Sequence, residues 1–117
     1  MLPIDPDRLE AVLESASEAR ARLEALREEA ESLRDALEKA ELAESVSRRT
    51  ALHSDEPIPQ LEERIERLKG RIARVNERRQ AAMDELRPVL DLAKRSRDYV
   101  IEFGNNSHRE VLRSYGF

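Results

Sequence analysis

Apolar side chains recur in steps of three and four residues along two long parts of the chain. In the second half they fall at Leu61, Ile65, Leu68, Ile72, Val75, Ala82, Leu86, Val89, Ala93, Val100 and Phe103. In the first half they fall at Leu9, Val12, Ala16, Ala19, Leu23, Leu26, Ala30, Leu33, Leu37 and Ala40. This spacing is typical of helices that lie against each other along one face. The pattern predicts an all-α fold, a long antiparallel two-helix hairpin of the coiled-coil type.

Capping residues and prolines set the expected limits of the helices. Asp5 suits an N-cap and Pro6 the first helical position, whereas Pro57 disfavours helix on both sides of itself. The expected elements of a single domain over residues 1–117 are a first helix over about 6–52, a turn over about 53–58, a second helix over about 59–103 and a short third helix over about 108–114. Pro88 lies inside the second helix, where we expect a kink without a break.

Two short stretches carry local signals of their own. Glu44 and Ser47 fall where the first stripe calls for apolar residues, so we expect local overwinding or fraying after Ala40. Gly104 suits a C-terminal cap, and Ser107 with Glu110 forms a capping-box pattern at the start of the third helix.

The two stripes are complementary if the turn is centred near Glu56. Facing residues then have numbers that sum to about 112, which places small residues opposite small ones and Leu9 opposite Phe103. The same register puts Arg48 near Glu62, and Glu41 near Lys69. Such exposed ion pairs contribute only about 0 to 1 kcal/mol each, so they select the register more than they stabilise it.

A hairpin alone does not account for all the apolar positions near the two ends of the chain. The surplus residues, which we predict to form an oligomer or partner surface, are Leu13, Met83, Leu90, Leu92 and Tyr99. A further layer should cover them. The short third helix, a second copy of the chain, or both would serve, and a second copy would complete a four-helix bundle in a dimer.

Composition narrows the class of protein. Charged residues make up 39% and aromatic residues 3% of the 117 residues, which predicts a thin, elongated core. There is no cysteine, which fits a reducing compartment. The chain shows no signal-peptide pattern and no apolar run of about 18 residues, so we expect a soluble, cytoplasmic protein without membrane contact.

Charge is distributed unevenly. The net charge is −4, which argues against a general polyanion binder, but residues 10–44 carry −6 and residues 67–80 carry +5. A basic stripe about 21 Å long by helical rise comprises Arg64, Arg67, Arg71, Arg74 and Arg78. A matching acidic stripe comprises Glu24, Glu28, Glu31, Asp35 and Glu38. The basic stripe fits a solvated face, a contact with the acidic stripe of another copy, or a phosphate-binding ridge. We favour self-association over nucleic acid because no aromatic base readers are interleaved.

The sequence offers little for catalysis or metal binding. His53 lies in the predicted turn without converging ligands, and His108 lacks the Glu-x-x-His pattern of di-iron bundles. No Ser or Thr has an evident His base, and no glycine-rich phosphate loop is present. Arg79 occupies a core position: its stem should pack while the guanidinium reaches solvent, or else it pairs with a carboxylate such as Glu29 and fixes the register.

These observations predict a protein without catalytic residues, cofactor or metal. We expect a structural or protein-interaction module, an oligomeric coiled-coil spacer or adaptor that acts as a homodimer or with a partner helix. The alternative is a nucleic-acid-associated coiled coil that uses the arginine stripe.

Overall fold

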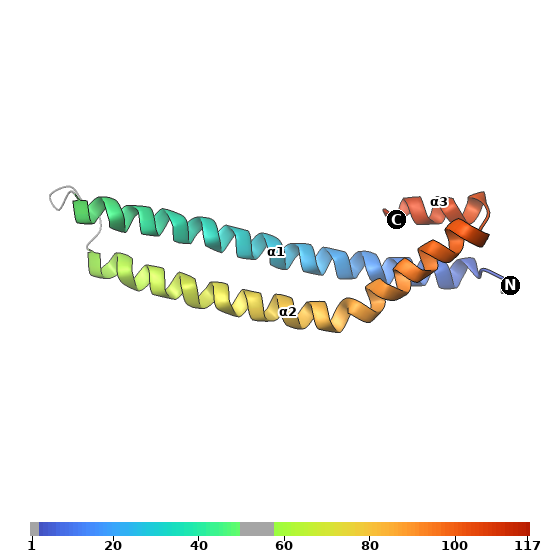
Figure 1. The fold of residues 1–117 in the computed structure, drawn as a ribbon, viewed down its shortest axis with the longest axis horizontal. Helices are drawn as coiled ribbons and strands as arrows, with labels where there is room; N and C mark the ends of the chain where they lie inside the picture. Colours follow the sequence, from blue (N-terminus) through green and yellow to red (C-terminus); the bar gives the residue numbers. More distant parts are fainter. Residues whose placement is uncertain (1–2, 50–57) are drawn as a thin grey trace. The chain divides into compact units, whose positions relative to one another are not determined.

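The computed structural model describes residues 3–49 and 58–117, and these residues form three helices and no strand. The helices are α1 (Pro6–Arg49), α2 (Ile58–Phe103) and α3 (Asn106–Ser114) (Figure 1). The predicted all-α fold, with two long helices that pack against each other and a short third one, is confirmed. The predicted turn, with His53 and Glu56, and the predicted extension of the first helix to residue 52 lie outside the described residues.

The helical hairpin divides into two compact units, each with its own core. We call residues 3–24 with 82–117 the terminal unit, and the described residues of 25–81 the central unit. The start of α1, the end of α2 and the whole of α3 belong to the terminal unit. The remaining parts of α1 and α2 make up the central unit.

In the central unit, the predicted stripes meet in one core. Its buried residues are Ala30, Leu33, Ala40, Ile65, Leu68 and Val75, with Ala36, Leu37 and Ile72 packed against them. Arg48 pairs with Glu62, as predicted, and Arg78 pairs with Glu29 at 3.5 Å. The residue that comes later in α1, Arg48, therefore pairs with the residue that comes earlier in α2, Glu62, and the reverse holds for Glu29 and Arg78, so the helices are antiparallel. The second predicted pair does not form, because Lys69 lies 3.7 Å from Glu66 of its own helix.

The prediction of local overwinding or fraying after Ala40 was wrong. α1 continues to Arg49, and Ser47 is buried at the position the stripe assigns to it, while Val46 is exposed. Glu44 is half-buried at its stripe position, and its carboxylate accepts a 3.0 Å hydrogen bond from Nε of Arg48. The guanidinium of Arg48 thus accommodates the polar Glu44 at a stripe position, and the three-four spacing of the stripe continues unchanged.

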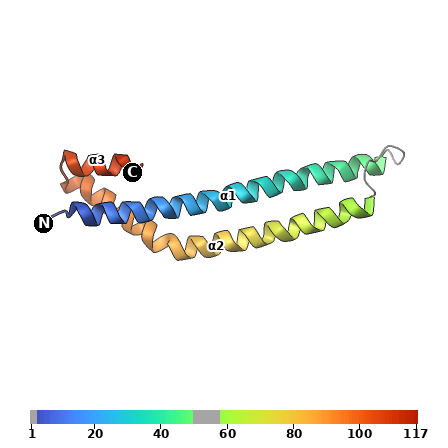
Figure 2. The same cartoon turned by 180° about the vertical axis from the view of Figure 1, so that it is seen from behind.

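Pro88 lies within α2, which remains helical through it. In both views the ribbon bends in its orange segment, which belongs to the terminal unit and contains this proline (Figures 1 and 2). Proline has no amide hydrogen to donate to the carbonyl four residues earlier, and its ring crowds that carbonyl. The prediction that Pro88 does not break the helix is confirmed, and the bend of this segment agrees with the predicted kink.

The core of the terminal unit forms where α3 packs on the hairpin. Leu9, Leu13, Val100 and Leu112 are its buried residues, and Ile4, Val111, Tyr115 and Phe117 pack against them. Leu112 of α3 thus joins Leu9 and Val100 in the core, while Phe103 is exposed. Phe103, which the stripe places opposite Leu9, therefore lies outside the buried residues of this core, because α3 supplies an apolar residue here.

Asn105 is the N-cap of α3, in place of the predicted Ser107. Its Oδ1 accepts a hydrogen bond from the backbone N–H of His108 at 3.0 Å, and Nδ1 of His108 accepts from the Asn105 N–H at 3.2 Å. This reciprocal pair satisfies two amide groups that a helix start otherwise leaves free. Asn105 precedes Ser107 by two residues, so α3 begins at Asn106 and not at His108.

The end of α3 closes back on its own chain. Gly116 has φ +78°, and the Phe117 N–H donates to the carbonyl of Leu112 at 2.9 Å. With the bond from the Gly116 N–H to the Arg113 carbonyl, this is the Schellman arrangement, whose left-handed position favours glycine. It brings Phe117 back over Leu112, and both belong to the terminal core.

Candidate interaction surface

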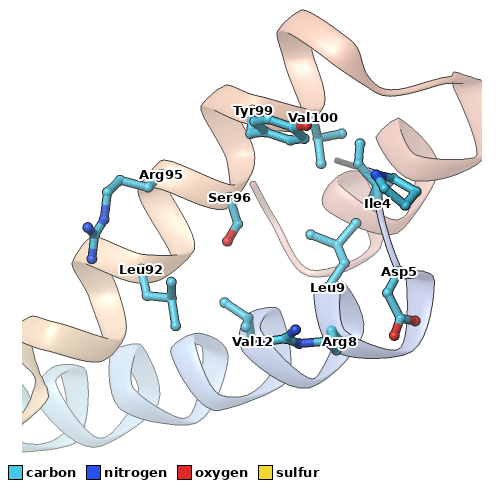
Figure 3. A pocket seen from close by; sticks show the side chains of 11 residues that line it. Ile4, Asp5, Arg8, Leu9, Val12, Leu92, Arg95, Ser96, Tyr99 and Val100 are labelled. Carbon is cyan, nitrogen blue, oxygen red and sulfur yellow. The ribbon is translucent and has the colours of Figure 1, made fainter. Parts of the chain in front are cut away.

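A groove of about 480 Å³ opens on the terminal unit between the start of α1 and the end of α2. Figure 3 shows Leu92 and Ser96 of α2 pointing toward Val12 of α1. The residues that line the groove are Pro3, Ile4, Asp5, Arg8, Leu9, Val12, Leu92, Arg95, Ser96, Tyr99 and Val100. Most of this lining is apolar, so water in the groove is easily displaced by another apolar surface.

The α2 side of the groove belongs to a second apolar stripe. Leu92, Ser96, Tyr99 and Phe103 follow one another in steps of four, three and four residues, beside the stripe that faces α1. We call these four residues the outer stripe. Leu92 and Phe103 are each 45% exposed, and the ring centroids of Tyr99 and Phe103 lie 4.9 Å apart. The outer stripe is spaced for a second helix, and its ends are open to solvent.

Charged residues border the outer stripe. Arg8 and Arg95 stand among the residues that line the groove, together with Asp5. Glu102 is exposed about two helical turns further along α2 than Arg95. Among the described residues, neither the guanidinium of Arg95 nor the carboxylate of Glu102 has an ion-pair or hydrogen-bond partner within its own chain. Both charges remain available to a partner.

The residues predicted to form a partner surface do not all lie on it. Leu13 is 0% exposed, so it serves the chain's own core beneath α3. Met83 and Leu92 are exposed, whereas Leu90 and Tyr99 are half-buried. Phe103 was placed in the hairpin core by the sequence pattern, and the structure adds it to the exposed surface. Its three-four spacing from Leu92 was the signal that could have identified it.

The arginine stripe and the acidic stripe are both exposed over their whole length. Arg78 pairs with Glu29, a residue beside the core and not a member of the acidic stripe. Arg67, Arg71 and Arg74 surround an open hollow of about 410 Å³ that Gly70 leaves by having no side chain, and Glu63 and Glu66 share it. The hollow therefore contains both signs of charge. Nothing in it is buried enough to select an anion over water.

Arg79 lies half-buried in the central unit, at its predicted core position. Among the described residues, no carboxylate pairs with it, and the carboxylate of Glu29 lies against Arg78. The second predicted alternative, a pair with Glu29, therefore does not form, and the packing of the aliphatic stem stays a prediction.

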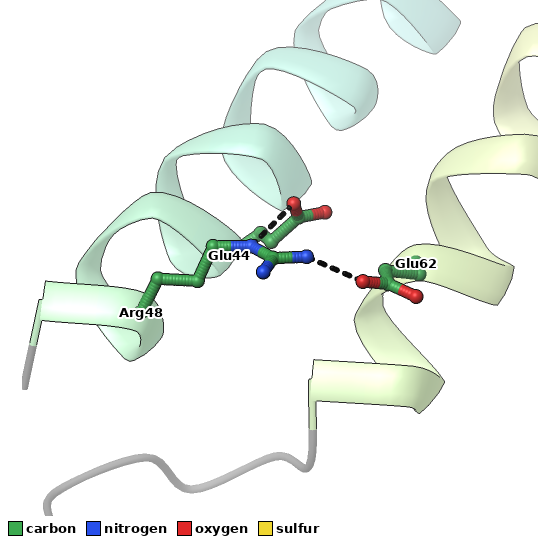
Figure 4. A network of polar contacts seen from close by, with 3 residues as sticks. All are labelled: Glu44, Arg48 and Glu62. Carbon is green, nitrogen blue, oxygen red and sulfur yellow. Dashed lines mark hydrogen bonds and ion pairs between the residues drawn. The ribbon is translucent and has the colours of Figure 1, made fainter. Parts of the chain in front are cut away.

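A three-residue polar network joins α1 to α2 in the central unit (Figure 4). The guanidinium of Arg48 donates to Oε1 of Glu44 at 3.0 Å and also donates to Glu62. Hydrogen bonding to Glu44, with the negative charges of both carboxylates, raises the pKa of Arg48. The side chains of Arg48 and Glu62 are about half exposed, so this network fixes the helix pair more than it prepares any chemistry.

The described residues contain no group of three or more His, Asp or Glu side chains that could hold a metal ion. His108 is engaged in the cap of α3. No described helix combines the length and the apolar character needed to cross a membrane. Comparisons with protein-family models, curated proteins and solved structures found no significant match to the chain. The groove and the outer stripe are therefore the features of the described residues that indicate a function.

Proposed function

We propose that the chain is a non-catalytic self-association module, a coiled-coil spacer or adaptor that forms a homodimer through the terminal unit. The observation that carries the proposal is the outer stripe beside the groove, with Leu92 and Phe103 each 45% exposed. Covering the exposed side of such an apolar stripe with another helix is favourable, because burial of apolar surface contributes about 25 cal/mol of free energy per Å² removed from water.

The packing of α3 removes one of the reasons that the sequence pattern gives for a dimer. α3 already covers Leu13, so the need for a second copy no longer includes that residue. What still supports a dimer is the α2 side of the terminal unit. The proposed interface is therefore smaller than the sequence pattern predicts, and its affinity should be moderate.

Sedimentation equilibrium of the full chain tests the proposal. Across micromolar to tens of micromolar concentrations, the average mass should rise from that of a 13.5 kDa monomer toward twice that value. A mass that stays at the monomer value at tens of micromolar would contradict self-association.

A second candidate function is nucleic-acid association, favoured by one observation, the exposure of every member of the arginine stripe along α2. Replacing Arg67, Arg71 and Arg74 with Glu separates it from a role in self-association. If the stripe contacts the acidic stripe of another copy, the triple variant should dissociate the oligomer, and reversing Glu28, Glu31 and Asp35 to Lys should restore it.

If the stripe binds nucleic acid, the triple variant should leave the oligomer unchanged and abolish binding to labelled duplex. The affinity of the unchanged chain should then fall by about 0.9 log unit per log unit of salt for each phosphate contacted. We expect no binding tighter than micromolar at physiological salt, because the net charge is −4.

A further inference from the structure

We infer that the outer stripe is covered by the same stripe of a second copy, with the two α2 helices antiparallel and Arg95 of each copy paired with Glu102 of the other. This inference rests on the proposed function and adds to it the geometry and the residues that choose the partner. It follows from three properties of the described residues: the register of the stripe, the placement of its charges, and the way the chain already pairs its own helices.

The register of the outer stripe is self-complementary. In the heptad of the outer stripe, Ser96 and Phe103 occupy position a, and Leu92 and Tyr99 occupy position d. Antiparallel packing places a against d, so the small Ser96 faces Tyr99 of the second copy and Phe103 faces Leu92. A two-fold axis between residues 97 and 98 generates all four contacts at once. Such an isologous contact closes as a dimer and leaves no open end.

The charges fit the same register. Arg95 and Glu102 precede the two a residues and therefore occupy g positions, where coiled-coil partners exchange ion pairs. Under the same two-fold axis, Arg95 of one copy faces Glu102 of the other, twice per dimer. A parallel arrangement would not bring these two residues together. The positions of Arg95 and Glu102 therefore favour the antiparallel orientation. They also favour a second copy of the chain over an unrelated helix as the partner.

The chain pairs its own helices by the same rule. Arg22 lies 3.4 Å from Glu85, and both take g positions beside the core stripes of the terminal unit. In the central unit, Arg78 and Glu29 are likewise g positions, and Arg48 and Glu62 are both e positions. Every one of these cross-helix pairs joins like heptad positions, as antiparallel helices require. The proposed contact between copies repeats a geometry that the described residues already display.

The groove gives the second copy room. It lies beside Leu92, Ser96 and Tyr99, and its other side is formed by the start of α1. Arg8 lines that side, and the incoming helix carries exposed Asp91 next to its stripe, whereas Asp98 is paired with Arg97 of its own helix at 3.0 Å. A helix seated there would cover apolar lining and meet an opposite charge at the rim.

Charge exchange at the two g positions tests the inference. Arg95→Glu and Glu102→Arg are each expected to weaken the dimer about tenfold or more, because each variant places like charges together twice. An equal mixture of the two variants should restore association as a one-to-one heterodimer, because both pairs are then opposite in sign. The double variant Arg95→Glu/Glu102→Arg should regain the homodimer.

Lys94→Glu is the matched control, because it makes the same charge change on an exposed residue of α2 that lies outside the seam. It should associate like the unchanged chain. Circular dichroism should show the same helical content in all variants. Sedimentation equilibrium then reads the masses of each variant and of the mixture.

The outcomes separate the inference from the proposed function. If the unchanged chain dimerises but the single variants associate equally well, or if the mixture fails to restore association, the antiparallel pairing is overturned and self-association stands. If the unchanged chain is monomeric at tens of micromolar, both are overturned. Restoration only in the mixture and in the double variant supports the inference.

Discussion

The guanidinium carbon of Arg20 lies 3.7 Å from the centroid of the Phe117 ring, and Nη1 of Arg20 donates to the carbonyl of Gly116 at 3.3 Å. Residues nearly a hundred positions apart are thus joined face to face in the terminal unit. Because α3 supplies Leu112 to the core and Phe117 follows α3 by three residues, these contacts hold in place the helix that covers Leu13.

We expect the contact between Arg20 and Phe117 to contribute about 0.5 to 1 kcal/mol to the free energy of unfolding. Phe117→Leu removes the ring but keeps an apolar side chain, and Arg20→Ala removes the cation. A double-mutant cycle from urea unfolding, followed by circular dichroism, measures their coupling. Strictly additive effects would show that the stacking contributes nothing.

Gly104 should tolerate no side chain. A Cβ at this position would lie 2.6 Å from the carbonyl oxygen of Val100 and 2.9 Å from its Cγ1, because the chain turns there from α2 into α3. Gly104→Ala is therefore expected to destabilise the chain by about 1 to 3 kcal/mol, the usual range for overpacking.

Gly70→Ala is the control for this change, because a Cβ there would have nothing within 4 Å. Alanine is favoured over glycine in a helix interior by about 1 kcal/mol, so this variant should be more stable than the unchanged chain. Denaturation midpoints of the two variants should move in opposite directions. A shift in the same direction would contradict the steric argument at Gly104.

The start of α3 should depend on Asn105. Its Oδ1 accepts from the His108 N–H, so Asn105→Ala should lower stability by about 1 kcal/mol. Ser107→Ala changes the residue that the sequence pattern favoured as the cap, and it should be close to neutral. Thermal unfolding of the two variants distinguishes them, and a larger loss from Ser107→Ala would place the cap elsewhere.

Tyr115 should make the terminal unit sensitive to alkaline pH. Burial raises the pKa of Tyr115 above its ordinary 10.0, and the hydrogen bond to Glu10, whose Oε1 lies 3.1 Å from the phenol oxygen, raises it further. The folded state thus favours the neutral phenol. Its contribution is fully present below about pH 10 and is lost as pH rises through the higher pKa of the folded state.

Unfolding midpoints measured from pH 8 to pH 12 should therefore fall more steeply for the unchanged chain than for Tyr115→Phe. Glu10→Gln should reduce the fall partly, because it removes the negative charge but leaves the burial. Equal slopes for the unchanged chain and Tyr115→Phe would contradict the predicted role of this phenol.

The sequence predicted the helices well because their signals are local. Three-four spacing, Asp5 at the start of α1 and Pro88 inside α2 each act within a turn or two of helix. The pair of Arg48 with Glu62 was also predictable, because antiparallel register follows from two stripes and one turn. Glu44 misled the prediction because its stripe position suits apolar residues, and only the position of Arg48 shows how it is accommodated.

The candidate surface was less predictable because it depends on what α3 covers. Leu13 and Leu92 both extend the apolar face of the hairpin, and no pattern shows that α3 buries the first and leaves the second exposed. Phe103 fits both the core stripe and the outer stripe. Leu112 of α3 joins the core with Leu9 and Val100, and neither stripe includes a residue of α3. The two stripes alone therefore do not show that Phe103 is exposed.

The most direct test of self-association through the terminal unit compares two exposed leucines. Leu92 is 45% exposed on the outer stripe, and Leu42 is 65% exposed on α1 in the central unit. We expect Leu92→Asp to shift the monomer–dimer equilibrium, measured by light scattering across a concentration series, at least about tenfold toward monomer, because it places a charge in an apolar contact. Leu42→Asp should leave the equilibrium unchanged. Dissociation by Leu42→Asp, with Leu92→Asp still dimeric, would place the contact elsewhere and contradict the proposal.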